Sequence, residues 1–401
     1  MLSYPDHDNS ILNVISSVRR YYRTSTAYPT LPLLDDVLGA FYKNVVLILL
    51  DGMGMNMAES LPRSAFLRRK ISDTLTSVFP SADIAAYTSC LTGLSPNEHG
   101  WLGRKLFFKE FCRTIDIVTN TDAYTKGAVT RMSAARFVMP HEYIFSDIAN
   151  SIIASVQPFT IAREGQVLSE KGNYHKTAVS QKKLFDLILR ICATDQHTFT
   201  FVRWNEPAEL AELYGCDSDE VKAMLGDISA NLEAVCGSMT DTLFIVTSSH
   251  GMTDISDELR IDRMRDITDC LTMPPFIEGR AISFFVKSEC RQAFERLFMD
   301  KFSSEFILLT RAELFRRNIL GRGVTHPKTS DFVGDYMACA ISDKSMRFLA
   351  LNEKPVKPPA AMSGGLTDAE MLVPLAVIPT KQTAKYRPPK LEDITPNRKF
   401  F

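Results

Sequence analysis

The sequence has almost no net charge and no long apolar segment. Its 46 lysines and arginines nearly balance its 47 aspartates and glutamates, so no overall field attracts nucleic acid or an anionic membrane. The longest clean apolar run, VVLILL at residues 45–50, is far shorter than the roughly 20 residues that a membrane-spanning helix needs. The N-terminal MLSYPDHDNS has no apolar signal core. We therefore expect a soluble, cytoplasmic protein that binds neither nucleic acid nor membrane.

The cysteines form no recognisable redox or metal motif. None of them belongs to a C-x-x-C pair, and most lie in apolar runs. This favours buried free thiols in a reducing compartment over disulfides. The sequence also lacks internal repeats and low-complexity tracts, so a repeat architecture is not expected. The eight cysteines are residues 90, 112, 192, 216, 236, 270, 290 and 339.

What is present is an alternation of apolar strands and amphipathic helices. KNVVLILLDGMG at 43–54 is typical of a buried strand in a parallel sheet, because β-branched residues and leucines fill both faces. Such alternation predicts an α/β fold with a mostly parallel sheet and helices on both faces. Further strands of the same type are expected at 198–204, 242–248, 281–286 and 373–379, and helices at 10–22, 180–193 and 217–236.

Two stretches interrupt this alternation. Residues 101–175 carry scattered aromatic and polar side chains, and residues 255–335 contain a strand–helix–strand run of their own. Both are predicted to be insertions that form a cap on one α/β domain spanning residues 1–400. The polar, proline-rich tail at 381–401 is expected to be poorly ordered.

Three polar residues lie where ligands gather in such sheets, beyond the carboxyl ends of the strands. Asp51 follows the strand VVLILL, and His250 follows the strand TLFIVTS. Asp83 precedes the predicted helix 84–91 within FPSADIAAYTSCLTG. A helix N-terminus holds anions well, so Asp83 either caps the helix or occupies a place built for a phosphate ester.

The order of these motifs resembles the alkaline phosphatase superfamily, and within it the type I phosphodiesterase/nucleotide pyrophosphatase branch. The matching stretches span residues 43–380 and are VVLILLDGMG, FPS…TSCLTGLSPNEHGW, ELYGCDSDEV, TSSHGMTD, FVGDYMACA and SGGLTDAEMLVPLAV. The resemblance implies an alkaline-phosphatase-like fold with two zinc ions held by six aspartate and histidine ligands. It also implies a threonine or serine nucleophile that attacks phosphorus.

Several of the implied site positions are substituted in this chain. Asp51 and His250 match family ligands, whereas Asp83 stands at the nucleophile position. The first metal therefore loses most of its ligands, while the second keeps two and gains Asp83. The remaining implied ligand positions are occupied by Ala208, Glu212, Ser249 and Ser363.

The resemblance with these substitutions implies a phosphodiesterase-like protein without ordinary two-zinc turnover, retained for binding or regulation as a pseudoenzyme. Its ligand would be a small phosphorylated molecule or a protein partner. The alternative is a single-metal phosphate-ester hydrolase in which Asp51, Asp83 and His250 hold one Mg²⁺, Mn²⁺, Ca²⁺ or Zn²⁺, with Asp83 as the candidate catalytic residue. A two-zinc centre is not expected in either case. Glu206 and Glu209 either add charge near Glu212 or form a solvated helix start.

Overall fold

The main sheet is the centre of the molecule. The computed structural model describes residues 1–144, 148, 151–156, 174–178, 180–349, 353 and 356–383. The strand order of the main sheet is β2-β18-β9-β1-β8-β6-β7. β9, β1, β8, β6 and β7 are parallel, and β18 is antiparallel to both of its neighbours. The strands are β1 Asn44–Leu50, β2 Ile71–Thr76, β6 Ser151–Val156, β7 Tyr174–Ala178, β8 Thr198–Trp204, β9 Thr242–Thr247 and β18 Leu372–Pro379.

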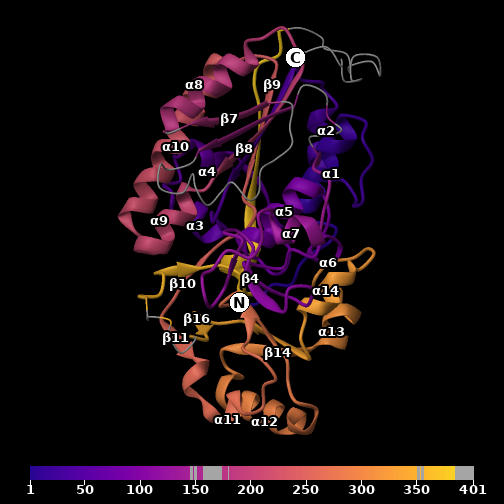
Figure 1. Cartoon of the computed structure of the whole chain (residues 1–401). Coiled ribbons are helices and arrows are strands. Elements are labelled where there is room, and N and C mark those ends of the chain that lie inside the picture. Colours follow the sequence, from indigo (N-terminus) through magenta and orange to yellow (C-terminus); the bar gives the residue numbers. More distant parts are fainter. Residues whose placement is uncertain are drawn as a thin grey trace.

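Helices cover both faces of the main sheet (Figure 1). Alternate side chains of β1 enter two different cores, with Val45 and Leu47 in one and Val46 and Ile48 in the other. The first core is covered by α1 Ile11–Tyr21, α2 Pro32–Leu38 and α5 Asp83–Thr92. The second is covered by α3 Met55–Ser60, α4 Phe66–Lys70, α8 Gln181–Cys192, α9 Glu206–Tyr214 and α10 Asp219–Ser238. The predicted α/β class, with helices on both faces, is confirmed.

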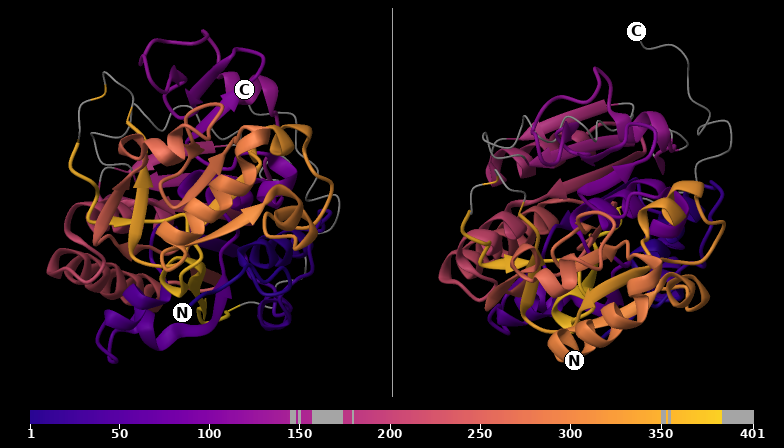
Figure 2. Two further views of the ribbon diagram at one scale, coloured as in Figure 1. Left: turned by 90° about the horizontal axis from the view of Figure 1, so that it is seen from below. Right: turned by 60° about the horizontal axis from the view of Figure 1, so that its bottom comes forward.

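A second seven-stranded sheet lies at one end of the main sheet, where Figure 2 shows its orange elements in front. Its order is β14-β15-β13-β12-β3-β4-β5, and neighbouring strands in it run antiparallel. We call this sheet and the helices around it the second lobe. The strands are β3 Lys105–Phe108, β4 Arg113–Asp116, β5 Thr121–Asp122, β12 Phe276–Ile277, β13 Ala281–Phe284, β14 Phe306–Thr310 and β15 Tyr336–Ala340.

Shorter elements complete the chain. Two small sheets pair β10 with β17 and β11 with β16. Their strands are β10 Thr253–Asp254, β11 Asp257–Arg260, β16 Lys344–Arg347 and β17 Ala361–Met362. The remaining helices are α6 Pro96–His99, α7 Ala134–Val138, α11 Arg265–Thr268, α12 Arg291–Phe302, α13 Arg311–Arg316, α14 Pro327–Phe332 and α15 Asp368–Met371, with 3-10 turns at Ile261–Arg263 and Ser288–Cys290.

The two predicted insertions do not form separate units. Strands from both pair in the second sheet, where Ile277 of β12 lies opposite Lys105 of β3. β6 falls within the predicted insertion at 101–175 and β7 begins at its end, yet both strands belong to the main sheet. The predicted tail at 381–401 lies outside the described residues from 384 onward. Its first residues are bonded to the domain, since the Asp241 amide donates to the Lys381 carbonyl at 3.0 Å.

Two predicted strands do form, but they run antiparallel to their neighbours and not parallel as expected. The apolar runs 281–286 and 373–379 do form strands, but β13 lies in the antiparallel second sheet and β18 is antiparallel within the main sheet. A continuous apolar run reports burial on both faces, and this burial does not depend on strand direction. Asp83 is likewise not the N-cap, because α5 begins at Asp83 and Ala82 holds the cap position.

The cysteines agree with the expectation of free, mostly buried thiols. All eight cysteines are free, and Cys90, Cys192, Cys216, Cys270 and Cys339 are buried. Within the described ranges, every helix is too short or too polar to cross a membrane.

Candidate functional site

Asp51 is placed by the pairing of two parallel strands. In the register of β1 and β8, Leu50 lies opposite Trp204, so both strands end at the same edge. The amide of Asp51 continues this pairing and donates to the Trp204 carbonyl at 2.9 Å. The Asp51 side chain is only 2% exposed. It therefore lies in a buried position beyond the carboxyl end of the strand, as the sequence predicts.

Arg203 reaches the same edge from β8. Successive strand residues point to opposite faces, so Phe199, Phe201 and Arg203 share the face that packs against α5. Phe201 indeed lies 6.3 Å from the ring of Tyr87, centroid to centroid. The Arg203 guanidinium carbon lies 3.9 Å from the centre of that same ring. Arg203 is thus fixed beside α5 by the alternation of its strand.

The guanidinium of Arg203 joins the two predicted aspartates. Its Nε donates to Asp51 Oδ2 at 2.6 Å, and its Nη2 donates to Asp83 Oδ1. The second oxygen of Asp51, Oδ1, accepts a hydrogen bond from Ser249 Oγ at 2.7 Å. Arg203 is 19% exposed and Asp83 is 48% exposed. The structure therefore brings Asp51, Asp83 and Ser249 together around a positive charge that belongs to the chain itself.

His250 makes a different set of contacts. Its ring is 2% exposed, and Nδ1 lies 2.9 Å from the Gly251 carbonyl. If Nδ1 donates to that carbonyl, Nε2 carries the lone pair. Nε2 is buried and has no hydrogen-bond partner among the residues that the structure describes. His250 Nε2 is therefore a buried acceptor without a partner in the described part of the chain.

The remaining predicted positions lie around the strand ends. Ala208, in the first turns of α9, packs so closely on Gly52 that a Cβ added to Gly52 would lie 2.8 Å from it. Glu212 follows one turn later and is exposed, with its carbonyl accepting the Ala360 amide at 2.7 Å. Ser363 directly precedes Gly364, whose added Cβ would lie 3.8 Å from the Cβ atoms of both Ala82 and Glu278.

Three glutamates near these positions have raised pKa values. Although Glu212 is exposed by surface area, desolvation of its carboxyl group raises its pKa to about 7, and the charges of Asp83 and Glu209 add to this effect. Burial and the charge of Glu206 raise the pKa of Glu209 to about 7. Burial also raises the pKa of Glu278 to about 7, with a smaller contribution from Asp83. The surroundings of Asp83 therefore contain several carboxyl groups, and the cations that act on them include Arg104 and Lys105 as well as Arg203.

Glu278 provides a test of this acidic environment. Its pKa is raised from 4.5 to about 7, so the stability that it contributes is full below its unfolded-state pKa and is lost as pH rises through about 7. We expect Glu278→Gln to have a melting temperature that rises relative to wild type between about pH 5 and about pH 8. The glutamine oxygen can still accept the Arg104 amide, which lies 2.6 Å from Glu278 Oε1.

Melting curves of both proteins across this pH range measure the effect. Glu220→Gln, an exposed change in the first turn of α10, is the control and should show a smaller pH-dependent difference. A difference between Glu278→Gln and wild type that stays constant with pH would contradict a raised pKa at Glu278.

The donor set does not fit two zinc ions. Ala208 and Ser363 offer no carboxylate or imidazole, and both oxygens of Asp51 already accept hydrogen bonds from Arg203 and Ser249. Zn²⁺ in proteins is bound by imidazole, thiolate and carboxylate groups. Within the described ranges, no group of three or more histidine, cysteine, aspartate or glutamate side chains is arranged to hold a metal.

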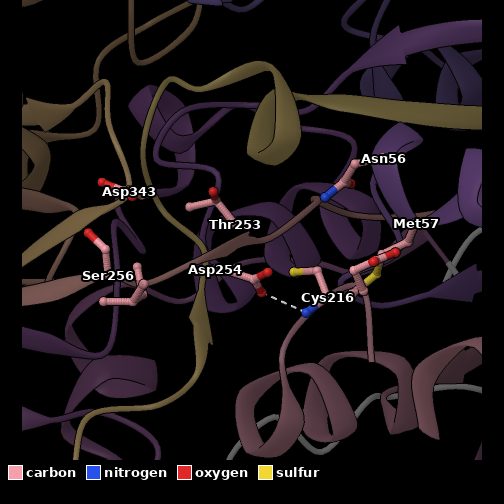
Figure 3. Close-up of a pocket in the computed structure, with 9 residues that line it drawn as sticks. Asn56, Met57, Cys216, Thr253, Asp254, Ser256 and Asp343 are labelled. Atoms are coloured by element: carbon pink, nitrogen blue, oxygen red, sulfur yellow. Dashed lines mark hydrogen bonds between the residues drawn. The ribbon is translucent and has the colours of Figure 1, made fainter. Parts of the chain in front are cut away.

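A cavity of about 370 Å³ lies next to this region but is lined by other residues (Figure 3). It contains three carboxylates, those of Asp217, Asp254 and Asp343. Asp254 Oδ1 accepts the Cys216 amide at 2.6 Å, the dashed bond in Figure 3. None of the predicted site residues lines this cavity, so the candidate site is a separate place at the strand ends.

The sequence reasoning missed Arg203, Tyr87 and Glu278. Arg203 carried a usable signal, because it is the single charged residue in the apolar strand TFTFVRW and shares its face with Phe199 and Phe201. Tyr87 and Glu278 gave no comparable signal. Glu278 comes from the second lobe, and the sequence does not show that this lobe reaches the strand ends.

The fold is that of the alkaline phosphatase superfamily. The family model described as type I phosphodiesterase/nucleotide pyrophosphatase matches residues 45–282, more than half of the 401 residues. The chain therefore belongs to this family. No curated protein matches the chain at a significant level.

Solved structures with the same fold include two mammalian proteins and one bacterial enzyme. Murine ectonucleotide pyrophosphatase/phosphodiesterase 5 is 17% identical, with a TM-score of 0.60 over 85% of this chain and 88% of that one. The human protein of that name is 14% identical, with a TM-score of 0.57 over 85% and 88%. Phosphonoacetate hydrolase from Sinorhizobium meliloti, in complex with phosphonoformate, is 14% identical, with a TM-score of 0.59 over 86% and 92%. At these identities the likeness concerns the fold.

Proposed function

We propose that this chain is a phosphodiesterase/nucleotide-pyrophosphatase-like protein that no longer hydrolyses phosphate esters through two zinc ions and is retained for binding or regulation. The observation that carries the proposal is the position of Asp83 and the pairing of its carboxylate. This residue stands at the nucleophile position in the first turn of α5, and its carboxylate is paired with Arg203. There is therefore no hydroxyl at the position from which the family attacks phosphorus.

A carboxylate is a poor substitute in this environment. Attack by an anion on an anionic phosphate requires nearby positive charge that neutralises both groups. Arg203 is the cation in direct contact, and it is shared between Asp51 and Asp83. The three groups together carry one net negative charge when the aspartates are ionised, and the neighbouring glutamates add to it as they ionise. Arg203, Asp51 and Asp83 together therefore do not attract a phosphate dianion.

The negative charge around Asp83 also affects which ligand the site can bind. The sequence led us to expect either a small phosphorylated molecule or a protein partner. An acidic site does not favour free phosphate, so a protein partner, or a ligand whose phosphate lies away from Asp83, agrees better with the geometry. The alternative of a single-metal hydrolase requires a metal among Asp51, Asp83 and His250, and the guanidinium already contacts both aspartates.

The expected result of an activity screen is no metal-dependent hydrolysis. Wild-type protein would be assayed on p-nitrophenyl phosphodiester and phosphomonoester substrates with added Zn²⁺, Mg²⁺ or Mn²⁺. We expect Asp83→Thr, which restores a hydroxyl, to show no gain, because no metal is available to lower the pKa of that hydroxyl. Asp83→Asn is the matched control, since it removes the charge without providing a nucleophile.

Two outcomes would contradict the proposal. One is metal-dependent turnover by the wild type. The other is a gain of about a hundredfold or more in Asp83→Thr over Asp83→Asn, since a metal-activated nucleophile produces gains of that order or larger. Elemental analysis of the purified protein should accompany the assay, because two stoichiometric zinc ions would show that the assigned ligand positions are wrong.

A further inference from the structure

The cation at the centre of the candidate site comes from the chain. Arg203 contacts Asp51, which follows β1, and Asp83, which opens α5. These acids are far apart in the sequence and carry like charges. Without a cation between them, the buried Asp51 would be costly to keep ionised. In this structure the guanidinium supplies that charge.

The contacts leave no room for a second cation between the two acids. Asp51 uses Oδ2 for Arg203 at 2.6 Å and Oδ1 for Ser249 at 2.7 Å. A divalent ion such as Mg²⁺ or Ca²⁺ binds carboxylate oxygens directly, at about 2.0–2.6 Å. To reach both acids it would have to displace Arg203, or else lie in contact with a like charge.

Arg203 is also held on its other side. Its guanidinium carbon lies 3.9 Å from the centre of the Tyr87 ring, and Tyr87 is fully buried. A guanidinium over an aromatic face gains cation–π attraction, and it cannot lose its charge by deprotonation. The cation is therefore fixed in place by one aromatic ring and two carboxylates, of which Tyr87 and Asp83 belong to α5 and Asp51 follows β1.

We propose that Arg203 takes the place of a metal ion in this site and excludes divalent cations from it. The proposal rests on the proposed function and deepens it, because it names the group that replaces the metal and the residue that sets the cation preference. It also makes a positive prediction. Removing the guanidinium opens Asp51 and Asp83 to a divalent ion, because two carboxylates remain without their counter-charge.

The test compares metal binding by wild type and Arg203→Met. Methionine is long and apolar enough to keep contact with Tyr87 but carries no charge. Each protein, first treated with EDTA, would be titrated with Mn²⁺ by calorimetry. We expect Arg203→Met to bind one Mn²⁺ per chain at least about tenfold more tightly than wild type. Arg203→Lys, which keeps a positive charge, should behave like wild type.

A double variant tests whether Asp83 binds the Mn²⁺ ion that Arg203→Met gains. Arg203→Met with Asp83→Asn should lose the tighter Mn²⁺ binding, since one of the two carboxylates is removed. Wild type that binds Mn²⁺ as tightly as Arg203→Met would overturn the proposal. So would an Arg203→Met protein that folds and binds no Mn²⁺.

A second measurement covers the case in which Arg203→Met does not fold. Melting temperatures of wild type and Asp83→Asn would be recorded with and without Mn²⁺. A ligand that binds the native state raises the melting temperature, so stabilisation of wild type that Asp83→Asn weakens would show a metal at Asp83 and overturn the proposal. The same response to Mn²⁺ in both proteins supports it.

The outcomes also separate this proposal from the proposed function. Hydrolysis by a wild type that binds no metal at Asp51 and Asp83 contradicts the loss of activity but leaves the cation assignment intact. A metal bound there without any hydrolysis contradicts the cation assignment alone.

Discussion

Replacing Arg280 by methionine is expected to lower the free energy of unfolding by about 3–5 kcal/mol, the usual cost of removing one partner from a buried ion pair. Arg280 and Glu370 have fully buried side chains. Arg280 Nε and Nη2 lie 2.6 and 2.7 Å from the two oxygens of Glu370. The substitution would leave Glu370 charged, buried and without its counter-charge.

The position of the Arg280–Glu370 pair increases the destabilisation that we expect from Arg280→Met. Arg280 immediately precedes β13 of the second lobe, and Glu370 lies in α15, which leads into β18 of the main sheet. Arg280 also donates to the carbonyls of Ser342 and Lys344, each at 2.6 Å. One guanidinium thus joins the second lobe to the main sheet, and its loss weakens that junction.

Urea unfolding, followed by fluorescence of the two buried tryptophans Trp101 and Trp204, measures the change. Arg69→Met is the control, because Arg69 and Glu233 form an ion pair that is 54% and 55% exposed and such pairs contribute only about 0–1 kcal/mol. Arg280→Met combined with Glu370→Gln should recover part of the loss. Equal losses for Arg280→Met and Arg69→Met would contradict the prediction.

Gly251→Ala is expected to destabilise the protein by about 1–3 kcal/mol or more, through overpacking next to the site. A Cβ on Gly251 would lie 2.0 Å from the Ala369 carbonyl oxygen and 2.8 Å from Gly54 Cα. Both neighbours are backbone atoms, so no side-chain rotation can relieve the contact. The loops after β1 and β9 and helix α15 would have to move apart.

The chain contains a matched control for this substitution. Gly226 lies within α10, and a Cβ there meets nothing within 4 Å. Gly226→Ala should stabilise the protein by roughly 0.5–1 kcal/mol, because alanine is the better helix former. Melting temperatures of both variants provide the comparison. A Gly251→Ala protein as stable as wild type would show that the packing between the two loops is looser than the structure indicates.

The main elements could be predicted from sequence because their signals are local. β1, β8 and β9 are continuous apolar runs, and α1, α8 and α10 show helical spacing with polar residues at their starts. Each pattern depends only on which face of one element is buried. The fold class followed from the alternation of these elements.

The assembly of the second sheet could not be predicted in the same way. It depends on pairing between residues 105–122 and 276–340, which are separated by much of the main sheet. Local patterns contain no information on which strand pairs with which, nor on strand direction. For this reason the apolar runs of β13 and β18 predict strands but do not reveal that these strands run antiparallel to their neighbours.

The candidate site, like the fold, could be predicted only in part. The resemblance supplied the positions of Asp51 and Asp83, and the strand ends place them together. It could not supply Arg203, because none of the stretches that carry the resemblance includes this residue. The contacts of Arg203 to Asp51 and Asp83 are visible only in the structure.

The place of β18 in the main sheet has a consequence for how the chain is made. β18 spans Leu372–Pro379, yet it lies between β9 and β2, which spans Ile71–Thr76. During translation β2 leaves the ribosome long before β18, the strand beside it in the described part of the chain, has been synthesised. A product that ends before β18 keeps β1, β8 and β9 but presents β9 as an open sheet edge, and such edges pair with other chains. The attachment of β2 to the main sheet and the protection of β9 therefore both depend on translation reaching residue 379.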